Sequence, residues 1–181
     1  MAELSKYTPN LRLGIRLKTI ILLRSIAVIG QLVTCLVVSN FLNFKLPYIE
    51  VYLTIGALAL SNFILFLLYS WNKRLSETTT TFVIGADIIQ LALLIFFTGG
   101  LSNPFVMLFI VPIAISIDNL PIRSSLILIV LTIVSVSIIG LYNYPLIKSD
   151  FSYLINPPII TIGIWFSLLV TILFLSLYVG R

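Results

Sequence analysis

Long, uninterrupted apolar segments restrict this chain to very few folds. Six of them are evident, at about 19–42, 48–70, 81–98, 105–117, 124–143 and 159–179. A helix needs roughly 20 apolar residues to cross the hydrocarbon core of a bilayer, whereas a transmembrane β-strand alternates in polarity. The apolar residues here are continuous, and only 9% of the chain is charged, against about 25% in an average soluble domain. We therefore predict an all-α integral membrane protein with six transmembrane helices, which excludes a soluble enzyme.

The fourth segment is the least certain of the six. It covers only 105–117, contains Pro112, and lies between Pro104 and Pro121. A proline inside a helix removes one backbone hydrogen bond and tends to kink the helix. The sequence therefore leaves two interpretations of this segment, a short tilted span and a re-entrant segment.

Lysine and arginine are distributed asymmetrically about the six segments. With six spans and a cytoplasmic N-terminus, nine of the eleven lie inside: Lys6, Arg12, Arg16, Lys18, Arg24, Lys73, Arg74, Arg123 and Arg181. Lys45 and Lys148 then lie outside. A re-entrant fourth segment would change the division to seven and four, so the positive-inside rule favours six spans with both termini in the cytoplasm. We interpret the net charge of +5 as an orientation signal and not as a sign of nucleic-acid binding.

This arrangement divides the chain into two regions. Residues 1–18 are predicted to form a basic cytoplasmic segment, and residues 19–181 a single six-helix transmembrane domain. Residues 7–18 alternate basic and apolar side chains, so they either lie on the inner leaflet as an amphipathic lead-in or act only as topogenic charges. The topogenic interpretation is favoured, because both roles share one composition.

Histidine and cysteine usage removes several kinds of chemistry. The chain has no histidine and a single cysteine, Cys35. A single cysteine excludes an internal disulfide and a thiolate metal cluster. The lack of imidazole excludes histidine ligation of zinc or haem and a phosphoacceptor histidine within these residues. We therefore expect neither a metal nor a haem.

The turn between the third and fourth segments is unusual in a chain of this composition. It reads Gly-Gly-Leu-Ser-Asn-Pro-Phe over residues 99–105 and is predicted to lie at the outer face. Gly99 and Gly100 lack a Cβ and allow a ligand to approach the backbone closely, and Asn103 offers amide donors and a carbonyl acceptor. Pro104 stiffens the turn, and Phe105 offers a flat apolar face. Such a set suits a planar, carbonyl-bearing, lipid-soluble ligand such as a quinone.

Polar side chains also occur within the predicted spans. Asp87 is the only acidic residue well inside a clearly predicted span, since Glu50 lies at the edge of the second, and Gln90 follows Asp87 one helical turn later. Three further polar groups lie at similar predicted depths: Arg24, Gln31 and Asn62. Intramembrane charges are costly and usually face the protein interior. These five residues are predicted to form one polar cluster, acting either as a proton or conformational relay or, as we favour, as structural contacts between helices.

The heptapeptide of residues 99–105 resembles the GGxxNPF motif of the RegB/PrrB/ActS family of redox-responsive sensor histidine kinases. That family places its motif in a short periplasmic turn after the third of six membrane helices, where the topology above places this one. The segment from Arg16 to Arg24, continuing to Gly30 and Gln31, and the segment with Pro112 also look like this family. The resemblance covers essentially the whole chain.

The resemblance implies a function in signalling. In that family the heptapeptide is implicated in sensing ubiquinone, and oxidised quinone lowers autophosphorylation and so the phosphorelay to a response regulator. By resemblance, the quinone-binding residues would be Gly99, Gly100, Asn103, Pro104 and Phe105, in a protein of the bacterial inner membrane. Gly99 and Gly100 would admit the ring, Asn103 would donate to a carbonyl, Pro104 would hold the turn, and Phe105 would stack on the ring.

The chain also departs from the family pattern. A histidine kinase needs a phosphoacceptor histidine and an ATP-binding core, and these 181 residues contain neither. Cys35 lies within the first helix and is not the family's cytoplasmic redox cysteine. We therefore expect the sensor part of a kinase, which is not catalytic alone and which would form a homodimer through a cytoplasmic part beyond these residues.

Two alternatives remain open at the level of sequence. One is a small secondary transporter or channel, in which Asp87 is the coupling carboxylate and the proline-containing fourth segment belongs to a substrate site. The other is a non-catalytic structural membrane subunit, whose glycine-rich turn is only a tight loop.

Overall fold

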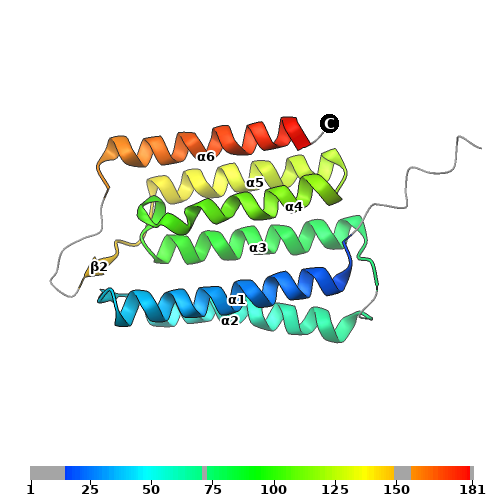
Figure 1. The fold of residues 1–181 in the computed structure, drawn as a ribbon, viewed down its shortest axis with the longest axis horizontal. Helices are drawn as coiled ribbons and strands as arrows, with labels where there is room; N and C mark the ends of the chain where they lie inside the picture. The colour runs from blue at the N-terminus through cyan, green and yellow to red at the C-terminus, as the bar shows by residue number, and fades with distance from the viewer. Residues whose placement is uncertain (1–14, 71–72, 149–155, 180–181) are drawn as a thin grey trace, which may run out of the picture.

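The computed structural model describes residues 15–70, 73–148 and 156–179. Over these residues the fold is an all-helical bundle, as predicted (Figure 1). The six α-helices are α1 (Leu17–Asn40), α2 (Tyr48–Leu68), α3 (Glu77–Phe97), α4 (Ile110–Asn119), α5 (Ile122–Leu141) and α6 (Pro158–Val179). Two 3-10 helices join α3 to α4: η2 (Gly100–Ser102) and η3 (Pro104–Phe109). The strands β1 (Phe44–Lys45) and β2 (Ile147–Lys148) form one short antiparallel pair.

The start of α3 follows from a local capping residue. Ser76 caps α3, because its hydroxyl accepts a hydrogen bond of 3.2 Å from the backbone N–H of Thr79. This cap lets α3 begin at Glu77, four residues earlier than the predicted start at residue 81. Threonine has only a modest helix propensity, so the threonine-rich first turn gives no clear helical signal in the sequence. The earlier start places Asp87 near the middle of α3.

The helices are arranged as a bundle in which α3 is central. The pair α1 and α2 forms one edge, α3 packs against α2 and α5, and α4 and α5 pack against α6 at the opposite edge (Figure 1). At one end, here called the basal end, α1 begins and α6 ends. At the other end, here called the turn end, α3 ends and η2 and η3 follow.

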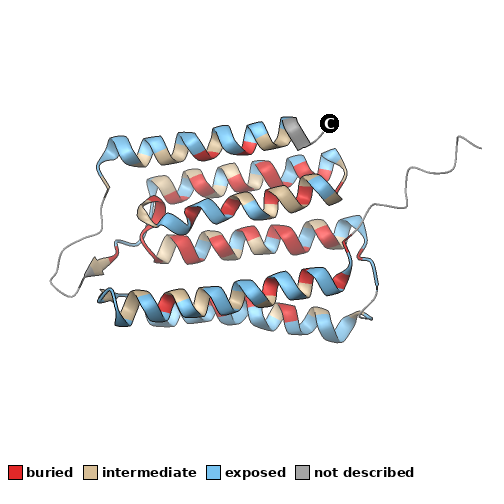
Figure 2. Ribbon diagram, in the orientation of Figure 1, coloured by how far each residue is buried: buried red, intermediate tan, exposed pale blue. Residues whose placement is uncertain are grey.

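The central helix is also more deeply buried than the outer helices. Half of the most apolar window of α3 is buried, compared with 11% for α6, and Figure 2 shows the buried residues concentrated on α3 and α5. The outer faces of α1, α2 and α6 expose many large apolar side chains, among them Leu22, Phe63 and Phe174. Monomeric soluble proteins rarely expose continuous apolar surface on this scale. The chain is therefore an all-α membrane protein whose outer helices face lipid.

The fourth segment consists of two helical parts. Among the described residues, five helices are long and apolar enough to cross a membrane, whereas the run Pro104–Asn119 is shorter. Its first part, η3, is a 3-10 helix, which rises about 2.0 Å per residue instead of about 1.5 Å. The combined segment is therefore roughly 27 Å long, close to the bilayer core of about 30 Å. Pro112 lies in the first turn of α4, where a missing N–H costs little.

Loops on the turn end close over the bundle. β1 pairs with β2 so that Phe44 lies opposite Lys148, and Leu46 and Leu146 beside this pair are buried. The residue pattern did not predict this two-residue strand pair. Residues 1–14 of the predicted basic N-terminal segment lie outside the described residues.

Candidate functional site

The two glycines of the heptapeptide create the turn after α3. Gly99 and Gly100 have φ values of +102° and +60°, a region that residues with a Cβ rarely adopt. A Cβ at Gly100 would lie 2.6 Å from the Cβ of Asn143, and one at Gly99 would lie 3.4 Å from the Cβ of Leu146. Both glycines are buried beneath the loop that follows α5. Their positions thus give them a role in chain reversal and loop packing, and their admission of a ligand ring stays a prediction.

Asn103 is held by hydrogen bonds within the turn. Its side-chain oxygen accepts from the backbone N–H of Phe105 at 2.9 Å and so caps η3. Its amide nitrogen donates to the backbone oxygen of Thr98 at 3.2 Å and to the Thr98 hydroxyl at 2.7 Å. An asparagine amide has two hydrogens, so both donors are already used. Donation from Asn103 to a ligand, as predicted, would first require one of these bonds to break.

A large apolar cavity lies beside this turn, between α1, α3 and the start of the fourth segment. Its volume is about 510 Å³, within the range of roughly 300–1,000 Å³ that is usual for small-molecule sites. Asn103, Pro104 and Phe105 form part of its wall, whereas Gly99 and Gly100 do not line it. Most of the remaining wall is apolar, including Leu23, Ile26, Leu91, Leu94, Leu108 and Leu146. Phe105 is 41% exposed, so its ring is accessible.

A few polar side chains interrupt the apolar lining. Gln31 and Thr34 enter the wall from α1, and Thr98 enters it from the end of α3. Cys35 also lines the cavity and is a free, buried thiol. Sequence reasoning did not single out Thr34, because a threonine inside an apolar helix is usually a packing residue.

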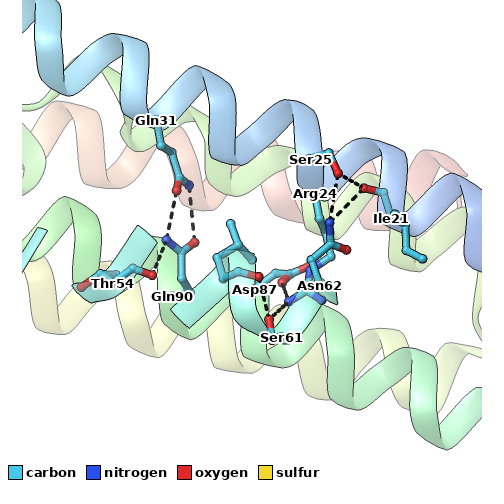
Figure 3. A network of polar contacts seen from close by, with 10 residues as sticks. Ile21, Arg24, Ser25, Gln31, Thr54, Ser61, Asn62, Asp87 and Gln90 are labelled. Atoms are coloured by element: carbon cyan, nitrogen blue, oxygen red, sulfur yellow. Dashed lines mark hydrogen bonds and ion pairs between the residues drawn. The ribbon is translucent and has the colours of Figure 1, made fainter. Parts of the chain in front are cut away.

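The predicted polar cluster lies across α1, α2 and α3, and one of its members, Gln31, also lines the cavity. Arg24 of α1 places its Nη2 atom 2.8 Å from Oδ1 of Asp87 on α3 and donates to the Ser61 hydroxyl on α2 at 2.7 Å (Figure 3). The contact with Asp87 is an ion pair by distance and not an aligned hydrogen bond. The Arg24 side chain is 6% exposed and that of Asp87 is 27% exposed.

The other three predicted residues make contacts nearby. Gln31 of α1 and Gln90 of α3 donate to each other at 3.4 Å and 3.1 Å, and Gln90 also approaches the backbone oxygen of Thr54 at 3.5 Å (Figure 3). Asn62 of α2 donates to the backbone oxygen of Ile21 at 3.2 Å and to the Ser25 hydroxyl at 3.0 Å.

These contacts therefore form two polar layers, one around Arg24 and Asp87 and one around Gln31 and Gln90. The sequence did not single out the hydroxyl partners Ser25 and Ser61, since their type alone does not distinguish a partner from a packing residue.

The polar layers account for how α1 is connected to α3. By backbone proximity α1 packs mainly on α2, and α3 packs mainly on α5 and α2. Arg24 and Gln31 are long side chains that reach from α1 across to α3. An unpaired charge in this setting would cost several kcal/mol, so the ion pair fixes the position of α1 relative to α3.

Fold and site together define an all-α integral membrane protein with a lipid-accessible cavity beside a polar layer inside the bundle. No protein-family model matches the chain, and no solved structure matches it. The sensor histidine kinase RegB of Cereibacter sphaeroides is 37% identical over 166 residues, which cover 92% of this chain and 36% of that protein. A second RegB sequence from the same species is 36% identical over 78 residues, 43% of this chain and 17% of the relative.

The chain belongs to the RegB family of sensor histidine kinases, as the heptapeptide resemblance indicated. It spans about a third of the length of the first of these relatives.

Proposed function

We propose that this chain is the membrane sensor region of a RegB-type histidine kinase in a bacterial inner membrane. Its relation to RegB over nearly its whole length supports this assignment, as do the apolar helices. In the full-length protein the region would regulate a cytoplasmic kinase core, which would pass a phosphoryl group to a response regulator. The proposed partners are the bilayer, a quinone, a second copy of the kinase and that regulator.

The proposed topology has six spans with both termini in the cytoplasm. The fourth segment leads from the turn end to the basal end, where α5 begins, as a complete crossing would and a re-entrant segment would not (Figure 1). Arg16 and Arg74 pair as an isolated β-bridge next to the start of α1. Lys45 and Lys148 belong to the strand pair at the turn end. The basal end would therefore carry the cytoplasmic charges expected from the positive-inside rule.

The proposed ligand of the cavity is a quinone, with ubiquinone as the family resemblance suggests. One observation carries this proposal: an apolar cavity of about 510 Å³ has Asn103, Pro104 and Phe105 of the heptapeptide in its wall. An isoprenoid tail is compatible with the apolar lining, and the exposed ring of Phe105 can stack on a planar headgroup. Asn103 and Pro104 would act by holding η3, and therefore Phe105, in place.

The experiment compares two glycines at which an added Cβ has open space around it. Gly30 lines the cavity, Gly163 lies on α6, and a Cβ at either position would meet no atom within 4 Å. Decylubiquinone is titrated into the purified protein in nanodiscs. We expect saturable binding to the wild type and to Gly163→Trp, and its loss in Gly30→Trp. A wild type without saturable binding, or unchanged affinity in Gly30→Trp, would refute the assignment of the cavity.

The transporter alternative gains no support from a specific contact. Asp87, its proposed coupling carboxylate, is engaged by Arg24 at 2.8 Å.

A further inference from the structure

We propose that the polar headgroup of the cavity's ligand is held from α1, by the Gln31 amide and the Thr34 hydroxyl, and not by Asn103. This inference rests on the proposed quinone site and specifies how that site recognises its ligand. It also makes Gln31 a shared residue, because the same side chain already pairs with Gln90 of α3.

Most hydrogen-bond donors around the heptapeptide side of the cavity are already used. Asn103 donates both of its amide hydrogens to Thr98, one to the backbone oxygen and one to the hydroxyl. The Thr98 hydroxyl in turn donates to the backbone oxygen of Leu94 at 2.7 Å. Pro104 has no N–H, and the Cys35 thiol is a weak donor. The side chains that the heptapeptide contributes to this wall are therefore already committed or unable to donate.

Two polar residues of α1 have hydrogen-bond donors that remain available. Gln31 shares one amide hydrogen with Gln90, at 3.4 Å, which leaves its second hydrogen available. The Thr34 hydroxyl has no hydrogen-bond partner anywhere in the part of the chain that the structure describes. The two residues are three positions apart in a helix, so they share one face, and both line the cavity. They form the free polar site in an otherwise apolar wall.

The chemistry of these two groups fits a quinone in either redox form. A primary amide and a hydroxyl can each donate to a carbonyl oxygen, and each can also accept from the hydroxyl of a hydroquinone. An apolar ring with one oxygen function at the α1 wall would thus satisfy both groups. Phe105 would remain the contact for the face of the ring.

A ligand bound to Gln31 would also affect the contact between α1 and α3. The Gln31–Gln90 hydrogen bonds, at 3.1 Å and 3.4 Å, lie at or beyond the long end of the usual range for N–H···O bonds. A ligand oxygen that draws Gln31 into the cavity would therefore compete with a weak contact. The next polar contact between α1 and α3 towards the basal end is the Arg24–Asp87 pair. A movement of the Gln31 side chain would therefore occur close to the ion pair that positions these helices.

The test measures binding of two probes to variants in nanodiscs. The probes are decylubiquinone and decylbenzene, which has the same alkyl chain on a ring without oxygen functions. The variants are Gln31→Leu and Thr34→Val, with two matched controls. Gln90→Leu removes the same glutamine pair but leaves the cavity wall unchanged, since Gln90 does not line the cavity. Thr171→Val removes a threonine hydroxyl from α6, where that hydroxyl donates to the backbone oxygen of Ser167.

We expect Gln31→Leu and Thr34→Val each to weaken decylubiquinone binding about five-fold, the factor that corresponds to about 1 kcal/mol for one neutral hydrogen bond. Their affinity for decylbenzene should not fall. Gln90→Leu should bind decylubiquinone at least as tightly as the wild type, because Gln31 is then released from its partner. Thr171→Val should match the wild type.

Two results would overturn the inference while the proposed function stands. One is wild-type affinity for decylubiquinone in both Gln31→Leu and Thr34→Val, with binding still blocked by Gly30→Trp. The other is an equal loss of affinity in Gln90→Leu and Gln31→Leu, which would attribute the effect to the helix pair. Absence of saturable binding to the wild type would instead refute the proposed function, and this inference with it.

Discussion

Removing the charge of Asp87 should destabilise the bundle more than any other conservative change in the polar layers. The substitution Asp87→Asn keeps the size of the side chain but leaves the Arg24 guanidinium without its counter-ion. Arg24 is only 6% exposed, and its Nε and Nη1 atoms have no hydrogen-bond partner among the described residues. Only its bond to the Ser61 hydroxyl, at 2.7 Å, would remain.

The magnitude follows from this burial. Breaking a buried ion pair by removing one partner typically costs about 3–5 kcal/mol, and a lone charge in a transmembrane helix costs about 2.5–3.5 kcal/mol on insertion scales. We therefore expect Asp87→Asn to lower the free energy of unfolding by about 3 kcal/mol. Arg24→Gln should cost about half as much, because the Asp87 side chain is 27% exposed and can be partly hydrated.

The measurement is a double-mutant cycle by equilibrium unfolding in mixed micelles, followed by circular dichroism. The variant that combines both substitutions has no unpaired charge, so its loss should be smaller than the sum of the single losses by about 2 kcal/mol. Ser61→Ala serves as the control, since it removes one hydrogen bond to a charged group and should cost about 1–2 kcal/mol. Additive losses in the cycle would show that Arg24 and Asp87 do not stabilise each other, and would refute the structural role assigned to the pair.

Three further predictions concern the turn end and the topology. Gly100→Ala should lower the thermal stability of the protein in detergent, because its Cβ would lie 2.6 Å from Asn143 at a φ of +60°, whereas Gly30→Ala should not. Asn103→Ala should lower stability by about 1–2 kcal/mol through loss of a helix cap, and Asn103→Asp should also be destabilising in the same unfolding assay, because it keeps the acceptor for the Phe105 N–H but places a carboxylate oxygen against the Thr98 carbonyl oxygen. Reporter fusions at the two ends of the chain should both give a cytoplasmic signal, and a periplasmic signal at the C-terminal end alone would mean that the fourth segment is re-entrant.

The helices could be predicted from sequence because their signal is local. A continuous apolar run specifies a membrane helix without reference to the rest of the chain. Spacing within a helix likewise placed Asp87 and Gln90 on one face, and depth placed Arg24 and Asp87 at a similar level. The contact of 2.8 Å between them is the geometry that such a prediction describes, although the spacing alone did not exclude another partner.

The state of the turn could not be predicted, because it depends on which partners the fold brings to each side chain. Whether Asn103 is free to bind a ligand depends on Thr98, five residues earlier, whose hydroxyl and carbonyl both accept from it. Whether Gly100 is open to a ligand depends on Asn143, which follows α5. Residue type shows what a side chain can donate or accept, but only the fold shows which partners have already taken those bonds.

This distinction affects how changes in the heptapeptide should be interpreted. Gly100 and Asn103 maintain the conformation of the turn, and the turn holds Phe105 in the cavity wall. Substitutions at Gly100 or Asn103 would thus reduce ligand binding by displacing the wall, even though neither side chain donates to the ligand. Loss of sensing in such variants would show that the turn matters without showing which groups contact the quinone. Substitutions on α1 separate the two effects, because Thr34→Val removes a hydroxyl from the wall and leaves every hydrogen bond of the turn in place.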